Sequence, residues 1–396
     1  FSGDGQREAE IQLPSGTTRA QPCGERASTT DARYFAFYAG GDQSGTLYLM
    51  DNNSVHEIEN VGVLTCLGMG TFLYSDDEAR FGYIDYLEGA PNDNSPSGDV
   101  VVRSVSNRDE IARFDNAVSF DLIGSTLIYV GLFTDNEEAG IQIVTDDSPR
   151  DVTTLRADTG CTFRNGQIQF AGEDRAIVLM GEACSGSSSN WRLFSVDLAD
   201  NSTTEIANGG TGGGYFGNVR TNALFVSEDN ATAYIAIPNG NTRYQSDILS
   251  VNLVDNSGDT DELIRFAVMP HEGRFYIPDA DAHPIISNDG AWLAIASSPP
   301  GAAPSMNLIN VAASNAVALD FEAGNAGDNV SAMAFTPGND RLFYVGGGND
   351  SDDNSLFVVD LFAGLEERLL RERFAKHMVL GPDVDGVVIG NWELID

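Results

Sequence analysis

The chain has 396 residues, and its 59 Asp and Glu residues outnumber its 22 Lys and Arg residues, which gives a formal net charge of −37. This charge excludes nucleic acid as a partner and argues against an anionic membrane surface, because both are bound through clusters of basic residues. No run of 18 apolar residues occurs, so the sequence predicts no transmembrane segment.

The N-terminal segment FSGDGQ lacks an initiating Met, which we interpret as a processed start from which an export signal has been removed. Four cysteines in an acidic chain fit an oxidising compartment. Of the three possible pairings we expect Cys23–Cys66 and Cys161–Cys184, because each pair closes a short loop between neighbouring strands. The sequence therefore predicts an extracytoplasmic protein that is secreted, periplasmic or attached to the cell surface.

A unit of four short strands repeats along the chain. The turn before its second strand lies near Asp31, Asp77, Gly124, Asp174, Asp229, Asp289, Asp340 and Asp385, at intervals of 45 to 60 residues. A period of about 40–50 residues is typical of four-stranded propeller blades. We therefore predict an all-β fold, a single β-propeller domain over residues 1–396, with eight blades as the preferred count and seven as the alternative.

The expected blades follow one another in chain order. They cover residues 24–61, 62–116, 117–158, 159–209, 215–268, 274–323 and 328–372, and the last combines residues 373–396 with 7–13. The chain ends on NWELID, which has the pattern of a third strand, whereas REAEIQLPSG near its start has the pattern of a fourth. Pairing of the N-terminal strand with the C-terminal blade would close the ring and remove an exposed sheet edge.

Two units resemble the repeats of TolB-like propellers, within the WD-type repeat propeller superfamily. The units are SNDGAWLAIAS with MNLINVAA, and TPGNDRLFYVGGG with SLFVVDLFAG, and the other six units match loosely. The repeats of that family have an S-x-D-G turn, an aromatic-rich strand and an I-x-x-x-D strand, and only the turn Ser287–Asp289–Gly290 matches closely. The resemblance implies a propeller fold, frequent export and a structural role for the Ser287–Asp289–Gly290 turn. Such propellers are binding platforms or domains of peptidases, so the resemblance implies little about chemistry.

The best candidate metal site is the loop between the second and third strands of the seventh unit. Its residues Asp350, Asp352 and Asp353 offer the hard carboxylate oxygens that calcium prefers, and we expect no other cofactor. A solvated loop is the simpler interpretation, because Asp, Asn and Ser are common turn residues. His56, His271, His283 and His377 lack metal-ligand spacing, and no G-x-S-x-G nucleophile elbow occurs.

We therefore predict a non-catalytic binding or scaffold propeller, which could be a subunit of a larger surface or periplasmic assembly. A protein partner or a small ligand would bind the loop-bearing faces. The long insertions are 88–98, 184–190, 208–216, 238–246, 255–261 and 298–305. The alternative is a lactonase-like or lyase-like enzyme whose acidic and His side chains act at the central channel.

Overall fold

The chain folds into short antiparallel strands, as seen in a computed structural model. The structure describes residues 17, 19–23, 29, 33–41, 44–51, 54–62, 64–67, 71–86, 97–133, 136–145, 148–185, 189–210, 224–227, 229–238, 245–254, 259–268, 285–287, 291–297, 305–310, 321–322, 329–335, 340–347, 355–362, 366–372, 379–380 and 387–388. In this part of the chain, no helix is long and apolar enough to cross a membrane.

Two sheets are formed by the first eleven strands. The first contains β1 (Arg19–Pro22), β2 (Tyr34–Gly40), β3 (Ser44–Asp51) and β4 (Ser54–Gly62) in that order, and the short helix α1 (Leu64–Leu67) follows it. The second contains β5 (Phe72–Tyr74), β6 (Arg80–Asp85), β7 (Gly98–Ser104), β8 (Glu110–Ile123), β9 (Thr126–Leu132), β10 (Glu138–Thr145) and β11 (Ser148–Arg156). The first part of β8 pairs with β7 and the later part with β9, so two four-stranded groups share this strand.

The remaining strands continue the pattern. One sheet has the order β12 (Cys161–Phe170), β13 (Arg175–Cys184), β14 (Ser189–Asp197), β15 (Thr203–Gly210). The next joins β16 (Leu224–Val226), β17 (Thr232–Pro238), β18 (Gln245–Asn252) and β19 (Thr260–Val268) to β20 (Ile285–Ile286), β21 (Trp292–Ser297), β22 (Ser305–Asn310) and β23 (Phe321–Glu322) through the single pair Ala267–Ser297. Then come β24 (Asn329–Phe335), β25 (Arg341–Gly347), β26 (Ser355–Asp360) and β27 (Glu366–Glu372), and the pair β28 (Val379–Leu380) and β29 (Val387–Val388).

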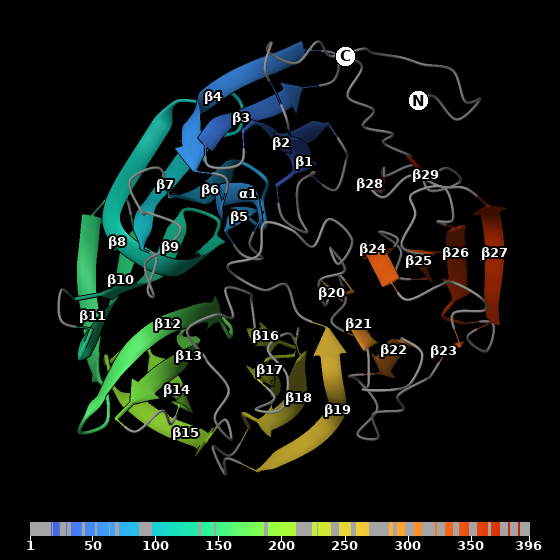
Figure 1. Cartoon of the computed structure of the whole chain (residues 1–396). Coiled ribbons are helices and arrows are strands. Elements are labelled where there is room, and N and C mark those ends of the chain that lie inside the picture. Colours follow the sequence, from blue (N-terminus) through green and yellow to red (C-terminus); the bar gives the residue numbers. More distant parts are fainter. Residues whose placement is uncertain are drawn as a thin grey trace.

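The sheets are arranged in a ring. Figure 1 shows them following one another around a common centre in chain order, from the blue β1–β4 sheet to the red β27 and β28. In each four-stranded group, the end of the second strand and the start of the third lie at the same end of the sheet. We call this end of the sheets the loop face. The opposite end, where the first strand turns into the second, is called the turn face. The all-β prediction is confirmed.

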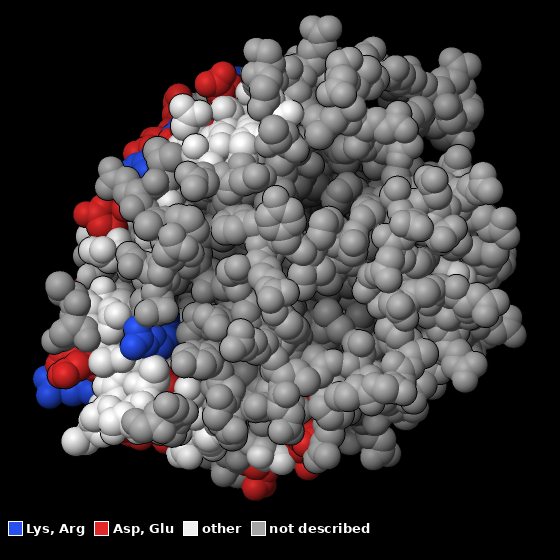
Figure 2. Space-filling view, in the orientation of Figure 1, with Lys and Arg blue, Asp and Glu red and all other residues white. Residues whose placement is uncertain are grey.

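Buried apolar residues fill the space between neighbouring sheets. Leu179 of β13, Ile235 of β17 and Ile295 of β21 belong to one buried cluster, which therefore joins successive sheets. Both faces of these strands are covered, so their sequences are almost continuously apolar, as in AIVLM on β13. Charged side chains remain on the rim, where Figure 2 shows acidic groups in red and few basic groups in blue.

The turn before the second strand has the same hydrogen bonds in different sheets. Ser75 Oγ donates to Asp77 Oδ1 (2.6 Å) and accepts from the first N–H of β6 (3.0 Å). Ser227 Oγ donates to Asp229 Oδ1 (2.6 Å) and accepts from the first N–H of β17 (2.9 Å). These bonds explain the recurrence of Ser-x-Asp in the sequence, because the serine and aspartate side chains close the turn.

The residue that follows this Ser-x-Asp triplet has a left-handed backbone. Its φ is 54° at Glu78 and 58° at Asn230. Glycine adopts this conformation at the least cost, which accounts for a glycine at the same place in SNDG, residues 287–290.

Arginines at the start of second strands hold neighbouring four-stranded groups together. Arg80 Nη1 donates to the carbonyl of Ser125 (3.4 Å), from β6 to the turn before β9. Arg175 Nη1 and Nη2 donate to the carbonyls of Leu253 (3.0 Å) and Asn230 (2.6 Å), from β13 to the β16–β19 group. Arginine suits this role because one planar guanidinium can donate to two acceptors at once.

Candidate functional site

Most of the residues singled out in the sequence lie outside the described part of the chain. They include the calcium candidates Asp350, Asp352 and Asp353, the histidines 271, 283 and 377, and the N-terminal strand 7–13. His56 is half-buried on β4. All four cysteines are described, and they form the disulfides Cys23–Cys66 and Cys161–Cys184, the two pairs that loop length favours.

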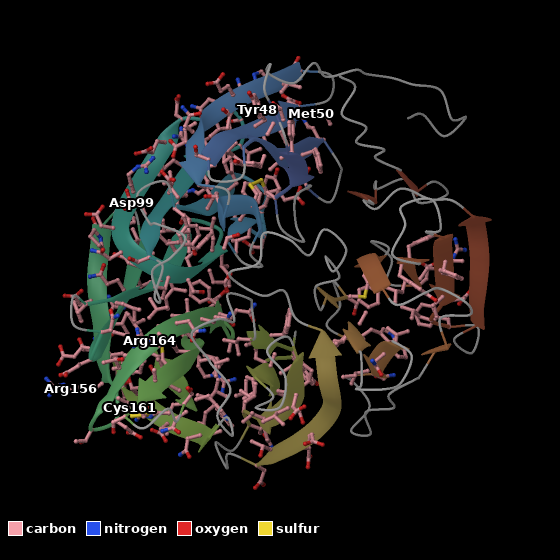
Figure 3. All side chains as sticks on the ribbon, viewed as in Figure 1. Tyr48, Met50, Asp99, Arg156, Cys161 and Arg164 are labelled. Carbon is pink, nitrogen blue, oxygen red and sulfur yellow. A yellow bond between two sulfur atoms is a disulfide. The ribbon has the colours of Figure 1, made fainter. Side chains whose placement is uncertain are left out.

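A group of linked charged side chains lies at the loop face of the β12–β15 sheet. It consists of Glu182 on β13, Arg192 on β14, Glu205 on β15 and Asp158 after β11, and we call it the Glu182 cluster. The Cys161–Cys184 disulfide lies beside it, between the directly opposed ends of β12 and β13. Figure 3 shows Cys161 and its disulfide at the edge of the ring, close to Arg156 at the end of β11.

Arg192 is the centre of the Glu182 cluster. Its Nη1 donates to Glu182 Oε1 (3.2 Å) and to the carbonyl of Arg156 (2.8 Å), and its Nη2 donates to Glu205 Oε2 (2.5 Å). The guanidinium also stacks over the ring of Phe194, with 4.8 Å between its carbon and the ring centroid. This arginine therefore links β11 to three strands of the next sheet, as a bidentate donor can.

Glu182 has no exposed surface. Its Oε1 accepts hydrogen bonds from Arg192 and from the Asp158 N–H (3.2 Å), but its Oε2 has no partner among the described residues. Burial raises the pKa of the Glu182 carboxyl above its ordinary value, and these hydrogen bonds only partly offset the effect. The carboxyl is therefore held at one oxygen, whereas its other oxygen has no partner among the described residues.

The Sγ atoms of Cys161 and Cys184 and a carboxyl oxygen of Glu182 all lie within 4.8 Å of one another. Such a set is a metal site only when the cysteines are thiolates. Both sulfurs are bonded to each other here, so the three residues are a disulfide with an adjacent carboxyl and not a set of metal ligands.

A second charged network joins the first two sheets. Glu59 on β4 accepts from Arg113 Nη2 at both oxygens (2.9 and 3.0 Å) and from Arg103 Nη2 at Oε2 (2.5 Å). Arg103 Nε donates to the Tyr83 hydroxyl (2.9 Å), and Arg113 Nη2 also donates to Glu110 (3.1 Å). We call these five residues the Glu59 network, in which every oxygen of the central carboxylate has an arginine partner.

Neither group was predicted from the sequence. A signal was present for Glu182, which is a single acidic residue in the apolar stretch RAIVLMGEAC and stands two residues before a cysteine. An ionisable group in a buried strand is rare unless it is paired, so such a residue indicates a partner nearby in the fold. Glu59 gave no comparable signal, because its strand SVHEIENVG alternates as any half-exposed strand does.

Comparisons with known proteins concern the fold. No protein-family model matches the sequence, and no curated protein matches it either. Among solved structures, the Dos1 propeller matches with a TM-score of 0.52 and 10% identity, over 92% of this chain and 90% of that one. A prolyl endopeptidase matches with a TM-score of 0.52 and 10% identity over 90% of this chain and 50% of that one, so this chain spans half its length. TolB from Acinetobacter baumannii matches with a TM-score of 0.32 and 12% identity, over 76% and 71%.

The chain has the β-propeller fold. This follows from the ring of antiparallel sheets and from the match to the Dos1 propeller over nearly all of both chains. The expected resemblance to β-propellers is confirmed at the level of fold. At 10% identity these matches extend no further than the fold.

Proposed function

We propose that this propeller has eight blades and works outside the cytoplasm as a non-catalytic binding or scaffold protein. The extracytoplasmic location is supported by the two disulfides, because such bonds persist in oxidising compartments. The binding role is supported by one observation above all. Polar side chains on two of the described inner strands, β8 and β12, hold the next sheet.

Asp121 and Gln169 are the clearest of these inner-strand side chains. Asp121 Oδ2 on β8 accepts from the Phe170 N–H on β12 (2.8 Å), and Gln169 Oε1 on β12 accepts from the Val226 N–H on β16 (2.9 Å). The innermost strand of a four-stranded group has one edge without a neighbouring strand. These side chains accept hydrogen bonds from backbone N–H groups on that edge. The rival hypothesis, a lactonase-like or lyase-like site at the channel, needs carboxylates that are available to a substrate, whereas Asp121 is already engaged with the backbone.

The experiment for the binding role is cross-linking in the native extracytoplasmic fraction. Lys376 is the only lysine, so amine reagents are unsuitable, and a carbodiimide-activated dihydrazide that joins carboxyl groups is the appropriate reagent. Cross-links to a partner are expected at loop-face carboxyls such as Glu137 and Asp158. Turn-face carboxyls such as Asp77 and Asp229 are the internal control. Equal labelling of both faces, or no cross-linked partner, would contradict the proposal.

Eight blades require that residues 7–13 complete the blade that begins with β28 and β29. Deletion of residues 1–14 is then expected to lower the melting temperature by several degrees, because the last blade loses its closing strand. Deletion of residues 1–6 alone is the control and should leave the melting temperature unchanged. Equal melting of the longer deletion and the intact protein would favour seven blades.

Calcium is the ligand that we propose for Asp350, Asp352 and Asp353, on the grounds of carboxylate density in one short loop. Calorimetric titration of the wild type should show binding heat that Asp352→Ala reduces. Identical titrations, or no heat at millimolar calcium, would remove calcium from the proposal.

A further inference from the structure

The two disulfides have different surroundings. Cys23 and Cys66 are 0% and 3% exposed and belong to an apolar cluster with Tyr38, Leu47 and Phe72. Cys161 is 8% exposed, but Cys184 is only half-buried, at the loop-face end of β13. A thiolate reagent in solvent must reach a sulfur atom to react, so only the second disulfide offers it access.

Polar groups surround the accessible disulfide. A carboxyl oxygen of Glu182 lies within 4.8 Å of both sulfurs. Asn190 Nδ2 donates to Cys184 Sγ (3.4 Å). A proton donor and a hydrogen-bond donor at a disulfide assist its opening, because they stabilise the negative charge that develops on the departing sulfur.

We propose that the Cys161–Cys184 disulfide is a thiol–disulfide exchange site for dithiols, with the Glu182 carboxyl as its proton donor. A thiolate of the dithiol attacks Cys184 Sγ and forms a new S–S bond. The bond to Cys161 Sγ breaks, its electron pair stays on that sulfur, and the Glu182 carboxyl protonates it. The two sulfurs thus have separate roles, Cys184 as the attacked atom and Cys161 as the leaving group.

The second half of the exchange releases the reagent. Its remaining thiol loses a proton to water and displaces Cys184 as a thiolate, which Asn190 stabilises until water protonates it. The dithiol leaves as a disulfide, oxidised by two electrons, while both cysteines are reduced and Glu182 regains a proton from solvent. The charges that face Glu182 during these steps are Arg192 on β14, with Glu205 behind it on β15, and Asp158 after β11.

The state of Glu182 supports this role. Burial raises the pKa of its carboxyl, so that the neutral acid persists to a higher pH than at an exposed glutamate. Above that pKa the carboxylate would repel both the incoming thiolate and the departing one. The rate constant per thiolate should therefore fall as the pH rises through the pKa of Glu182.

The test is graded reduction of the intact protein, with alkylation of free thiols and peptide mass mapping. With dithiothreitol, Cys161 and Cys184 should be labelled at least about ten times faster than Cys23 and Cys66, since exchange rates follow access to the sulfur. A thioredoxin-type protein with a C-x-x-C dithiol is the second reagent. Selective reduction by both reagents, or by one of them, supports the site and identifies the source of the dithiol.

Two variants separate proton donation from structural effects. Glu182→Gln keeps the shape of the side chain without its acid proton, and should slow reduction of Cys161–Cys184 about ten-fold or more, as loss of a general acid does. Glu205→Gln removes the other carboxylate on Arg192 but keeps the acid proton of Glu182, so it should slow reduction less than Glu182→Gln does.

Three results would overturn the proposal: equal reduction of both disulfides, a Glu182→Gln rate equal to the wild type, or equal slowing by both variants. If Glu182→Gln does not fold, the wild-type pH profile decides. A rate constant per thiolate that does not change with pH would then overturn the role of Glu182.

Discussion

The contact between the first two sheets and the loop face of the β12–β15 sheet are built from the same parts. Each contains one disulfide and one network of arginines and carboxyl groups. At the first contact, Cys23–Cys66 joins β1 to α1, and Glu59 has an arginine partner at both oxygens. At the β12–β15 sheet, the disulfide lies within one sheet, and Glu182 keeps one oxygen without a partner among the described residues.

The two central carboxyls differ in burial and in pairing. Glu59 has two arginines and partial exposure, so its charge is compensated on every side. Glu182 shares a single arginine with Glu205 and has no exposed surface, so burial raises the pKa of its carboxyl. The two networks thus differ in their central carboxyls: both oxygens of Glu59 are paired with arginine, whereas burial raises the pKa of Glu182.

The largest expected effect concerns the two disulfides. By the chain-entropy relation, loss of Cys23–Cys66 should lower the free energy of unfolding by about 4 kcal/mol, and loss of Cys161–Cys184 by about 3.5 kcal/mol, because their sequence separations are 43 and 23. Urea unfolding of the two double Cys→Ala variants would measure both values. A greater loss at Cys161–Cys184 would contradict the view that the first disulfide is the structural one.

Replacement of the central arginines is the next test. Arg192→Met should lower the free energy of unfolding by about 3 kcal/mol, since it leaves Glu182 buried without a partner. Arg113→Met should cost about 1 kcal/mol, because its partners are partly exposed and Arg103 still holds Glu59. The control is the double variant Arg192→Met with Glu182→Leu, which should recover much of the loss. Equal costs for the two arginines would refute the contrast between the regions.

The sequence predicts the all-β propeller fold but not the Glu182 cluster, for different physical reasons. A blade depends on local patterns, such as the Ser75–Asp77 turn, and these repeat at a visible period. The Glu182 cluster depends on contacts between strands far apart in the chain, such as Arg192 with the carbonyl of Arg156. Only the isolated acidic residue in an apolar strand marks its position in advance.

The stabilities of variants at Glu182 and at Glu59 should differ when the pH is changed. The pKa of folded Glu182 is raised above 4.5, so this residue stabilises the folded protein below that pH, and its contribution is lost as the pH rises through the folded pKa. Relative to wild type, Glu182→Gln should therefore become more stable with rising pH. Glu59→Gln should instead be destabilised by about 1.5 kcal/mol at neutral pH, because it loses charge-assisted hydrogen bonds. Melting curves between pH 4 and 8 would show both trends.

The smallest expected effect is at the outer edge of the Glu59 network. Arg113 and Glu110 are 30% and 39% exposed, with 3.1 Å between Nη2 and the carboxylate oxygen. An exposed pair of this kind contributes at most about 0.5 kcal/mol, and salt screens it. A double-mutant cycle with Arg113→Met and Glu110→Gln should give this coupling at low salt and almost none in 1 M NaCl. The same cycle on Arg192 and Glu182 should be larger and insensitive to salt, because solvent ions do not reach a buried carboxyl. Equal salt dependence of the two couplings would mean that Glu182 is open to solvent, and the distinction between the two regions would then be lost.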